Sequence, residues 1–288
     1  MDQADNLKKA EKGAWISICA YVVLATAKLI IASIGNSEAL RADGLNNTTD
    51  IVASIAVLIG LKISRKPPDE DHHYGHYRAE TVASLFAAFV IVTVGLQVII
   101  DTFEQLFADA TVQPGMLTAW TALAGAAVMF IVYGYNVSLA KKIGSSSLNA
   151  AAQDNRSDAL VSLGAFVGII GAQSGLYWLD PLAGLVVGVI ICKTAWDIFR
   201  DATHTLTDGF DEKQIMIIKT SIAKVREVKK VVDIKGRIHG NQAFIDITIL
   251  VNPNLTVKES HAITERIETL LREKHNIPYA HIHIEPYE

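Results

Sequence analysis

Two pairs of oxygen-bearing side chains interrupt otherwise apolar runs of this chain. Asn46 and Asp50 lie in the second run, and Asp154 and Asp158 lie in the fifth. The members of each pair are four residues apart, so a helix would place them on one face, one turn apart. Together the pairs supply four oxygen ligands, which suits a compact site for a divalent cation. The alternative for either pair alone is helix capping or an interhelical hydrogen bond.

A carboxylate near the centre of a bilayer costs about 2.5–3.5 kcal/mol even on lenient insertion scales. Two aspartates in one span therefore indicate that something compensates their charge, such as a bound cation. Asp43 lies near the predicted start of the second run, where an interfacial position would explain it. Arg156 lies between Asp154 and Asp158 and must point to another side of the helix, towards an acid or the interface.

The segment between the second and third runs is rich in metal-binding side chains and reads K-P-P-D-E-D-H-H-Y-G-H-Y-R-A-E. Asp69, His72 and His76 form a D-x-x-H-x-x-x-H set, and imidazole with carboxylate suits zinc, iron or manganese. The segment therefore predicts a second metal site, with a solvated histidine-rich loop as the alternative.

The C-terminal part of the chain holds five of the nine histidines. His281 and His283 are two residues apart on a predicted strand, so they share a face with Glu285. His261 lies near the start of the preceding predicted helix. We interpret His261, His283 and Glu285 as a third candidate metal site, with a polar sheet edge as the alternative.

The elements that must position these residues are mostly membrane spans. Of the 288 residues 50% are hydrophobic and 19% charged, whereas ordinary soluble domains carry about a quarter charged residues. The net charge of −4 argues against a nucleic-acid-binding chain, and the two cysteines form no disulfide framework. Apolar runs of roughly 20 residues, long enough to cross a bilayer, recur along the chain. The six predicted spans are Ala14–Gly35, Leu40–Ile63, Thr81–Leu106, Met116–Ala140, Leu148–Ala172 and Pro181–Phe199.

The distribution of lysine and arginine predicts the orientation of these spans. Lysines precede the first span and lie between the fourth and fifth, and lysines with arginines lie between the second and third, whereas segments 108–115 and 173–180 carry neither residue type. The positive-inside rule then places both termini in the cytoplasm of a multi-pass cell-membrane protein. No small-residue cleavage site follows the first run, so we expect a retained helix and not a signal peptide. Asp180 before Pro181 predicts the N-cap of the sixth helix.

From residue 208 onwards the chain becomes more densely charged and changes its hydrophobic period. An α-β-β-α-β order in so short a stretch indicates a small α+β sandwich, with the helices covering one face of a three-stranded sheet. The predicted domains are therefore a six-helix transmembrane domain, residues 1–207, and a cytoplasmic domain, residues 208–288. The elements predicted for the second domain are helices Glu212–Val228 and Val257–Lys274 and strands Val231–Ile238, Ala243–Val251 and Ala280–Glu285.

Taken together, these residues resemble the cation diffusion facilitator family of divalent metal transporters over nearly the whole chain. The resemblance implies six transmembrane helices, a cytoplasmic metallochaperone-like α+β domain, and a homodimer that exchanges a divalent metal for protons across the bilayer. The G-H-Y-R-A-E run looks like the start of the family's third helix. The family's metal ligands fall on Asn46, Asp50, Asp154 and Asp158 in the helices and on Asp69, His72 and His76 in the loop.

The helix quartet departs from the zinc-transporting members, which usually place a histidine there. The pattern N-x-x-x-D with D-x-x-x-D resembles the manganese-transporting branch instead. Ligand chemistry also favours manganese, because an all-oxygen site prefers harder cations such as Mn²⁺ over zinc.

The tail also departs from the family pattern, which uses additional histidines on the first two strands. This chain has Val232 and Thr248 near those places, so the tail site is expected to be depleted, or rebuilt with His239 or His281.

The resemblance also implies a charge pair. Arg78 would pair with Asp208 and tie the membrane bundle to the tail at the dimer interface, unless the two are unrelated interfacial charges.

The expected function is proton-coupled antiport that exports divalent metal, chiefly Mn²⁺, from the cytoplasm, and not enzymatic catalysis. Protons compete with metal for the quartet oxygens, because a carboxylate must be deprotonated to bind metal. Zn²⁺, Fe²⁺, Co²⁺ or Cd²⁺ remain alternative substrates. A membrane-anchored metal sensor would not need buried acids, a metalloenzyme would need a motif such as H-E-x-x-H, and a channel would show no proton coupling.

Overall fold

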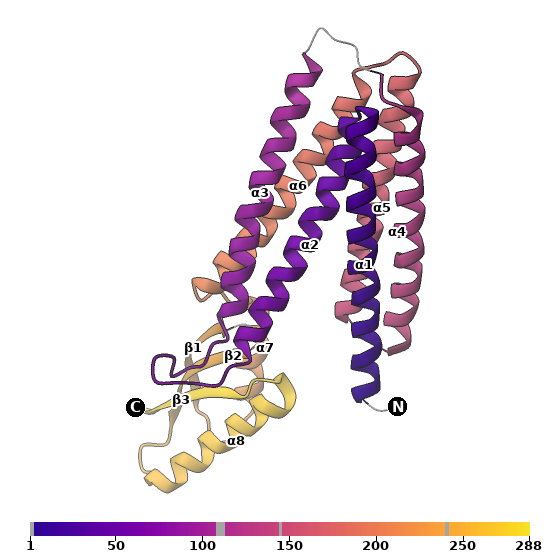
Figure 1. The fold of residues 1–288 in the computed structure, drawn as a ribbon. Helices are drawn as coiled ribbons and strands as arrows, with labels where there is room; N and C mark the ends of the chain where they lie inside the picture. The colour runs from indigo at the N-terminus through magenta and orange to yellow at the C-terminus, as the bar shows by residue number, and fades with distance from the viewer. Residues whose placement is uncertain (1–2, 108–112, 144–145, 240–241) are drawn as a thin grey trace. The chain divides into compact units, whose positions relative to one another are not determined.

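The computed structural model describes residues 3–107, 113–143, 146–239 and 242–288. Six long helices come first along the chain, and a small α+β part follows (Figure 1). Each predicted apolar run lies within one of these helices. The helices are α1 (Gln3–Gly35), α2 (Glu38–Ser64), α3 (Ala79–Leu106), α4 (Met116–Ile143), α5 (Ser146–Gln173) and α6 (Leu179–Leu206).

Five helical segments in the described chain are long and apolar enough to cross a membrane. They are Trp15–Gly35 of α1, all of α2, all of α3, Met116–Lys142 of α4 and all of α6. The helix α5 is not among them, because its first half carries Asp154, Arg156 and Asp158. It packs instead against α4 and α1, which gives its polar side chains protein neighbours.

Large apolar side chains on these helices are exposed, Ile34, Phe86 and Ile131 among them. Extended apolar surface of this kind marks contact with lipid or with another protein. With the length of the helices, it makes this chain a multi-pass membrane protein.

The chain forms two compact units that do not coincide with the predicted division at residue 207. One unit comprises Met1–Ala56 and Phe86–Asp197, and the other comprises Val57–Leu85 and Ile198–Glu288. The second unit thus contains the histidine-rich loop, the adjoining helix ends and the whole tail. The domain boundary at residue 207, with the transmembrane domain before it and the cytoplasmic domain after it, remains a prediction.

Asp180 caps α2 and not α6, so the predicted role of this residue is wrong. The helix α6 begins one residue before Asp180. The Asp180 carboxylate accepts hydrogen bonds from the Ser37 hydroxyl and from the Glu38 backbone N–H, both at 2.7 Å. The first N–H groups of a helix need external acceptors, and at α2 a side chain from α6 supplies one.

The tail contains helices and strands in the predicted order. β1 pairs antiparallel with β2, and β2 pairs parallel with β3, which makes a three-stranded sheet. A capping box of Thr256 and Glu259 starts the second helix, and Asn276 in the left-handed conformation ends it. The elements are α7 (Glu212–Ile222), β1 (Lys230–His239), β2 (Gln242–Val251), α8 (Val257–His275) and β3 (Tyr279–Pro286).

The helix α7 is shorter than predicted, since it ends at Ile222 and not at Val228. The backbone N–H of Ala223 closes the last turn onto Lys219, and the following N–H groups, Val225 and Val228 included, bond three residues back. These tighter turns bring Val228 into the core, where it is 9% exposed. Apolar periodicity alone does not distinguish such turns from a helix.

The core of the tail lies on one face of the sheet. Side chains of β2 on this face pack against α7 and α8, so the helices cover one face as predicted. Ile282 and Ile284 of β3 join this core, and alternation along the strand therefore places His281, His283 and Glu285 on the opposite, exposed face.

Candidate metal sites

The helices α1, α2 and α5 meet at the carboxylate of Asp158. Asn46 Nδ2 donates a hydrogen bond to Asp158 Oδ1 at 3.0 Å, and the Tyr21 hydroxyl donates to Asp158 Oδ2 at 2.7 Å. Asn46 and Asp158 are each only 6% exposed. The two predicted helix pairs therefore contact each other through one ligand from each helix.

Asp50 and Asp154 are the other two members of the predicted quartet, and they are less closely associated than Asn46 and Asp158. One oxygen of Asp50, Oδ2, is buried and has no hydrogen-bond partner in the described part of the chain. Asp154 is exposed, and the three acids are not gathered within 4.8 Å of one another in the described residues. The quartet thus has two contacting members, one partly buried acid and one accessible acid.

A second layer of polar side chains supports Asp158 and was not identified from the sequence. Asn155 Nδ2 donates to the Tyr21 hydroxyl at 3.4 Å, and Ser17 donates to Asn155 Oδ1 at 2.8 Å. Asn136 of α4 donates in turn to Ser17 at 2.9 Å. Tyr21 and Ser17 are four residues apart in an apolar helix, a spacing that puts both on one face and could have indicated this network.

We expect Tyr21→Phe to weaken metal binding by about 10- to 100-fold, the usual effect of removing an outer-shell partner of a ligand. Phenylalanine keeps the ring packing but leaves Asp158 Oδ2 without its donor. Calorimetric Mn²⁺ titration of the purified protein in detergent measures the effect. An unchanged affinity in a folded Tyr21→Phe variant would show that the hydroxyl does not position Asp158.

Asp43 and Arg156 lie in different surroundings. Asp43 is fully buried and forms an ion pair with Lys28 of α1 at 2.9 Å, so the interfacial position suggested for it is wrong. Arg156 is exposed and points away from Asp158, as its place on the helix predicts.

The loop residues Asp69, His72 and His76 are brought together in the second unit. Asp69 Oδ1 lies 3.1 Å from His72 Nδ1, and Asp69 Oδ2 lies 3.3 Å from His76 Nε2. One potential ligand atom from each residue lies within 4.8 Å of the others, and no other group of three or more acids, histidines or cysteines in the described residues does so. The backbone N–H of His72 bonds the Asp69 carboxylate and lowers its pKa, which keeps it ionised and able to bind a cation.

Aromatic contacts hold this loop against the sheet within the same unit. Tyr74 meets the rings of His239 and Phe244 edge-on, with centroids 6.3 and 6.2 Å away. Phe244 stacks on Tyr279 at 4.6 Å. The loop cluster is thus attached to the tail through side chains of β1, β2 and β3.

Arg78 and Asp208 form an ion pair at 2.6 Å. The same Arg78 nitrogen lies 2.9 Å from His239 Nε2, so β1 joins the pair. The sequence did not place His239 here. The role of this pair at a dimer interface remains a prediction.

The contact with Arg78 sets the sign of a pH effect at His239. Burial, and then the charge of Arg78, lower the pKa of His239, so its neutral form accepts a hydrogen bond from Arg78. The contribution of this contact to stability is present above the ordinary histidine pKa of about 6.5 and is lost as the pH falls below it. We expect Arg78→Ala to raise the pKa of His239, as measured by NMR titration of labelled histidine in the full chain. Arg200→Ala is the matched control, because Arg200 pairs with Asp201 elsewhere on the same unit; equal pKa values in both variants would contradict the assignment.

The tail residues His261, His283 and Glu285 are not brought together within one chain. His283 and Glu285 lie side by side on the exposed face of β3, 3.6 Å apart at their nearest atoms. His261 lies on α8, which covers the other face, and its Nε2 lies 3.5 Å from Glu265 Oε1. Thr248 is opposite His283 in the sheet, so no histidine of β2 rebuilds the site there.

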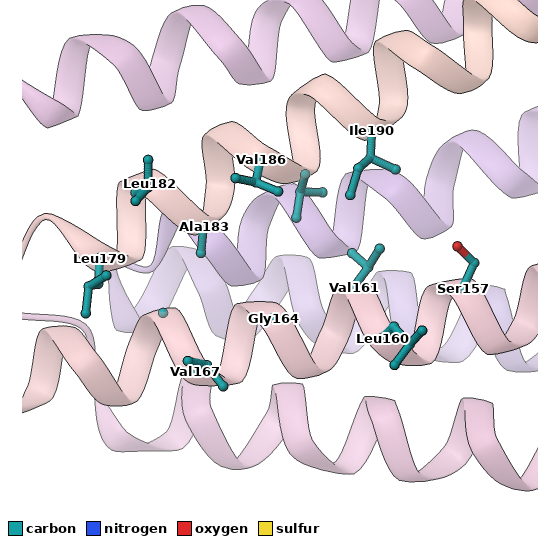
Figure 2. A pocket seen from close by; sticks show the side chains of 12 residues that line it. Ser157, Leu160, Val161, Gly164, Val167, Leu179, Leu182, Ala183, Val186 and Ile190 are labelled. Atoms are coloured by element: carbon teal, nitrogen blue, oxygen red, sulfur yellow. The ribbon is translucent and has the colours of Figure 1, made fainter.

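A groove of about 410 Å³ between α5 and α6 is a further cavity of the membrane domain (Figure 2). Leu160, Val186 and Ile190 are among the residues that line it, and Ser157 is the one polar side chain among them. A groove without carboxylates or imidazoles has no ligands for a divalent cation. The quartet and the loop cluster therefore remain the candidate metal sites.

A multi-span helical domain with buried acids at its helix contacts, joined to an α+β domain, defines a membrane transporter of cations. Two family models match the chain: the cation efflux transmembrane domain over residues 14–207 and the cytoplasmic domain of cation efflux proteins over residues 210–287. The chain therefore belongs to the cation efflux family, also called the cation diffusion facilitators, as its sequence predicts. Its function is metal efflux across a membrane, and it is not an enzyme.

Two relatives from Bacillus subtilis (strain 168) are similar over almost their whole length. The manganese efflux system protein MneS is 54% identical over 288 residues, which cover 100% of this chain and 99% of MneS. The manganese efflux system protein MneP is 31% identical over 287 residues, which cover 96% of each chain. The solved MamM CTD in its copper form is 26% identical over 27% of this chain and 76% of its own, with a TM-score of 0.26.

Proposed function

We propose that this protein exports Mn²⁺ from the cytoplasm in exchange for protons. The observation that carries the proposal is the contact of Asn46 with Asp158, one helical turn from Asp50, whose Oδ2 is buried and unpaired in the described part of the chain. Amide and carboxylate oxygens are hard ligands, which Mn²⁺ accepts more readily than zinc does. The two relatives named as manganese efflux proteins support the same substrate.

The hydrogen bonds at Asp158 explain how metal and proton exclude each other. Both Asp158 oxygens accept hydrogen bonds, from Tyr21 and from the amide nitrogen of Asn46. The Asn46 carbonyl oxygen is then the amide atom available to a cation. Metal must replace the Asn46 donor at Asp158, and a proton on that carboxylate removes the negative charge that binds metal. Proton uptake at these oxygens therefore opposes metal binding directly.

The direction of transport follows from the proposed orientation. We place both termini and the tail in the cytoplasm, because lysine and arginine gather on that side of the spans. Asp154, the accessible member of the quartet, lies nearer the N-terminal end of α5, which is the cytoplasmic end in this orientation. Metal would reach the quartet through Asp154. The proposed active form is a homodimer, since the tail matches the family's cytoplasmic domain.

The loop cluster of Asp69, His72 and His76 is proposed as a second metal site with mixed ligands. His76 is only 15% exposed, whereas His72 and Asp69 are about half exposed, so a cation there would exchange readily with solvent. A site of His261, His283 and Glu285 would require ligands from two chains, since one chain does not assemble it.

Metal uptake into proteoliposomes under an imposed pH gradient tests this function. We expect Mn²⁺ flux that depends on the gradient in the native protein. Flux of Zn²⁺ or Fe²⁺ without Mn²⁺ flux would retain the transporter and refute the proposed substrate. Flux that ignores the gradient would indicate a channel, and no flux of any of these metals in a folded protein would favour a membrane-anchored sensor.

A further inference from the structure

Lys28 is a buried cation in the middle of an apolar span. It lies in the span Trp15–Gly35 of α1 and is 0% exposed. Its ammonium group is surrounded by three side-chain oxygens: Asn47 Oδ1 at 2.7 Å, Asp43 Oδ1 at 2.9 Å and Ser162 Oγ at 2.9 Å. We call Asp43, Asn47 and Ser162 the oxygen cage. Carboxylate, amide and hydroxyl oxygens are also ligands that hard metal cations use.

Gly125 of α4 leaves space for this lysine. A Cβ atom on Gly125 would lie 2.8 Å from Lys28 Cε and 3.4 Å from Nζ, so a larger residue there would displace the end of the Lys28 side chain from its present position. Ser162 also donates to Asp43 Oδ1 at 3.1 Å, which fixes two cage members relative to each other. An ion pair buried to this extent is expensive, and apolar residues of similar volume often stabilise a fold as well or better. Its presence therefore indicates a role beyond packing.

The cage has unused coordination capacity. Asp43 Oδ2 is buried and has no hydrogen-bond partner in the described part of the chain. The whole Asp43 residue is 0% exposed. Buried polar atoms are normally satisfied, so an unpaired carboxylate oxygen calls for a specific explanation. The ammonium uses one Asp43 oxygen, whereas a metal cation can use both oxygens of a carboxylate.

Two members of the cage lie about one helical turn beyond the quartet. On α2, Asp43 is three residues before Asn46, and on α5, Ser162 is four residues beyond Asp158. Both are displaced towards the turn between α1 and α2, opposite to the accessible Asp154. Asn47 follows Asn46 directly, so it joins the cage to the level of the quartet. A cation leaving the quartet in that direction meets the cage next.

We propose that Asp43, Asn47 and Ser162 form a second divalent-cation site on the transport path, closed in this conformation by the ammonium of Lys28. Lys28 acts as a tethered cation that holds the site and must withdraw before a metal ion enters it. This inference rests on the proposed export function, because it places the cage on the exit side of the quartet.

Calorimetric titration of the full chain in detergent with Mn²⁺ tests the site directly. Lys28→Ala removes the tethered cation, and we expect it to bind one more Mn²⁺ per chain than the native protein. The double variant Lys28→Ala/Asp43→Asn loses a cage charge and is expected to return to the native count. Lys193→Ala is the matched control, because Lys193 is an exposed lysine of α6. The same count in native and Lys28→Ala protein would overturn the proposal.

A milder substitution of Lys28 tests the same role if the Lys28→Ala variant does not fold. Lys28→Gln retains a donor for the cage and removes the charge. In proteoliposomes we expect its Mn²⁺ flux to become equal with and without a pH gradient, because the exit side is no longer closed by a fixed charge. Gradient-dependent flux identical to that of the native protein would refute the tethered-cation role. No Mn²⁺ flux in the native protein would instead refute the proposed function.

Discussion

Replacing Asp158 with alanine is expected to lower Mn²⁺ transport by more than about 100-fold, beyond the usual effect of losing an outer-shell partner. Asp158 is the residue at which three helices meet, since it accepts hydrogen bonds from Tyr21 of α1 and Asn46 of α2. Without its carboxylate, the quartet loses a charged ligand and the contact between its two helix pairs. Asp50→Ala is expected to have the same effect on transport, because it removes the only acid of the facing pair.

The matched variant separates loss of ligation from loss of structure. Asp158→Ala leaves two buried donors unpaired, each at a cost of roughly 1–3 kcal/mol, so its unfolding temperature will fall. Asp158→Asn keeps an acceptor for the Tyr21 hydroxyl and the volume of the side chain but removes the charge. Its new amide nitrogen can donate to the carbonyl oxygen of Asn46 once the Asn46 amide is turned over. We expect Asp158→Asn to unfold near the native temperature and still to lose transport.

Gradient-driven Mn²⁺ uptake and thermal unfolding are measured on the same preparations. Asp197→Asn is the control outside the site, since Asp197 is an exposed acid of α6 paired only loosely with Lys193 at 3.4 Å. Native rates in a folded Asp158→Asn variant would show that metal does not pass through the quartet.

The spacing of Asn46 with Asp50 and of Asp154 with Asp158 was sufficient to predict one contact surface on each of two helices. Helical periodicity fixes which residues share a face, and a charged residue in a membrane span needs a partner. The structure adds that Asn46 and Asp158 are the members in contact. Periodicity cannot predict which members are in contact. It fixes the directions of side chains around one helix, but not how far two helices are shifted along each other's axes.

The functional contacts of Tyr21 and Lys28 cannot be recognised from spacing alone. Tyr21 resembles an ordinary aromatic residue of an apolar span until its hydroxyl is found on Asp158. Lys28 gave a usable signal, because a lysine in the middle of a membrane span requires an acid, and Asp43 was available on the next helix. Only the packed structure shows that the two are buried together.

In the α+β tail, the spacing of residues along the chain does not predict which side chains of different elements come together. Alternation along β3 correctly groups His283 with Glu285 on one face. It does not predict which face the helices cover, and α8 covers the other one, so His261 is separated from the pair. In contrast, Asp69, His72 and His76 are close in sequence, and a short turn is enough to bring them together.

Replacing Asp154 with histidine is expected to shift selectivity from Mn²⁺ towards Zn²⁺. Asp154 is the accessible member of the quartet, so a larger side chain fits there without displacing the contact of Asn46 with Asp158. Imidazole adds a nitrogen ligand, which zinc prefers, to a site otherwise made of oxygens. We expect the ratio of Zn²⁺ to Mn²⁺ transport to rise by at least about tenfold, equivalent to about 1.4 kcal/mol of discrimination.

Competition uptake with both metals in the same proteoliposomes measures this ratio directly. Asp154→Asn is the matched variant, because it removes the charge without adding a nitrogen ligand and is expected to slow both metals alike. A higher ratio in Asp154→His alone would assign selectivity to ligand chemistry at the quartet. An unchanged ratio in Asp154→His would show instead that helix packing around the quartet, and not its ligand types, selects the metal.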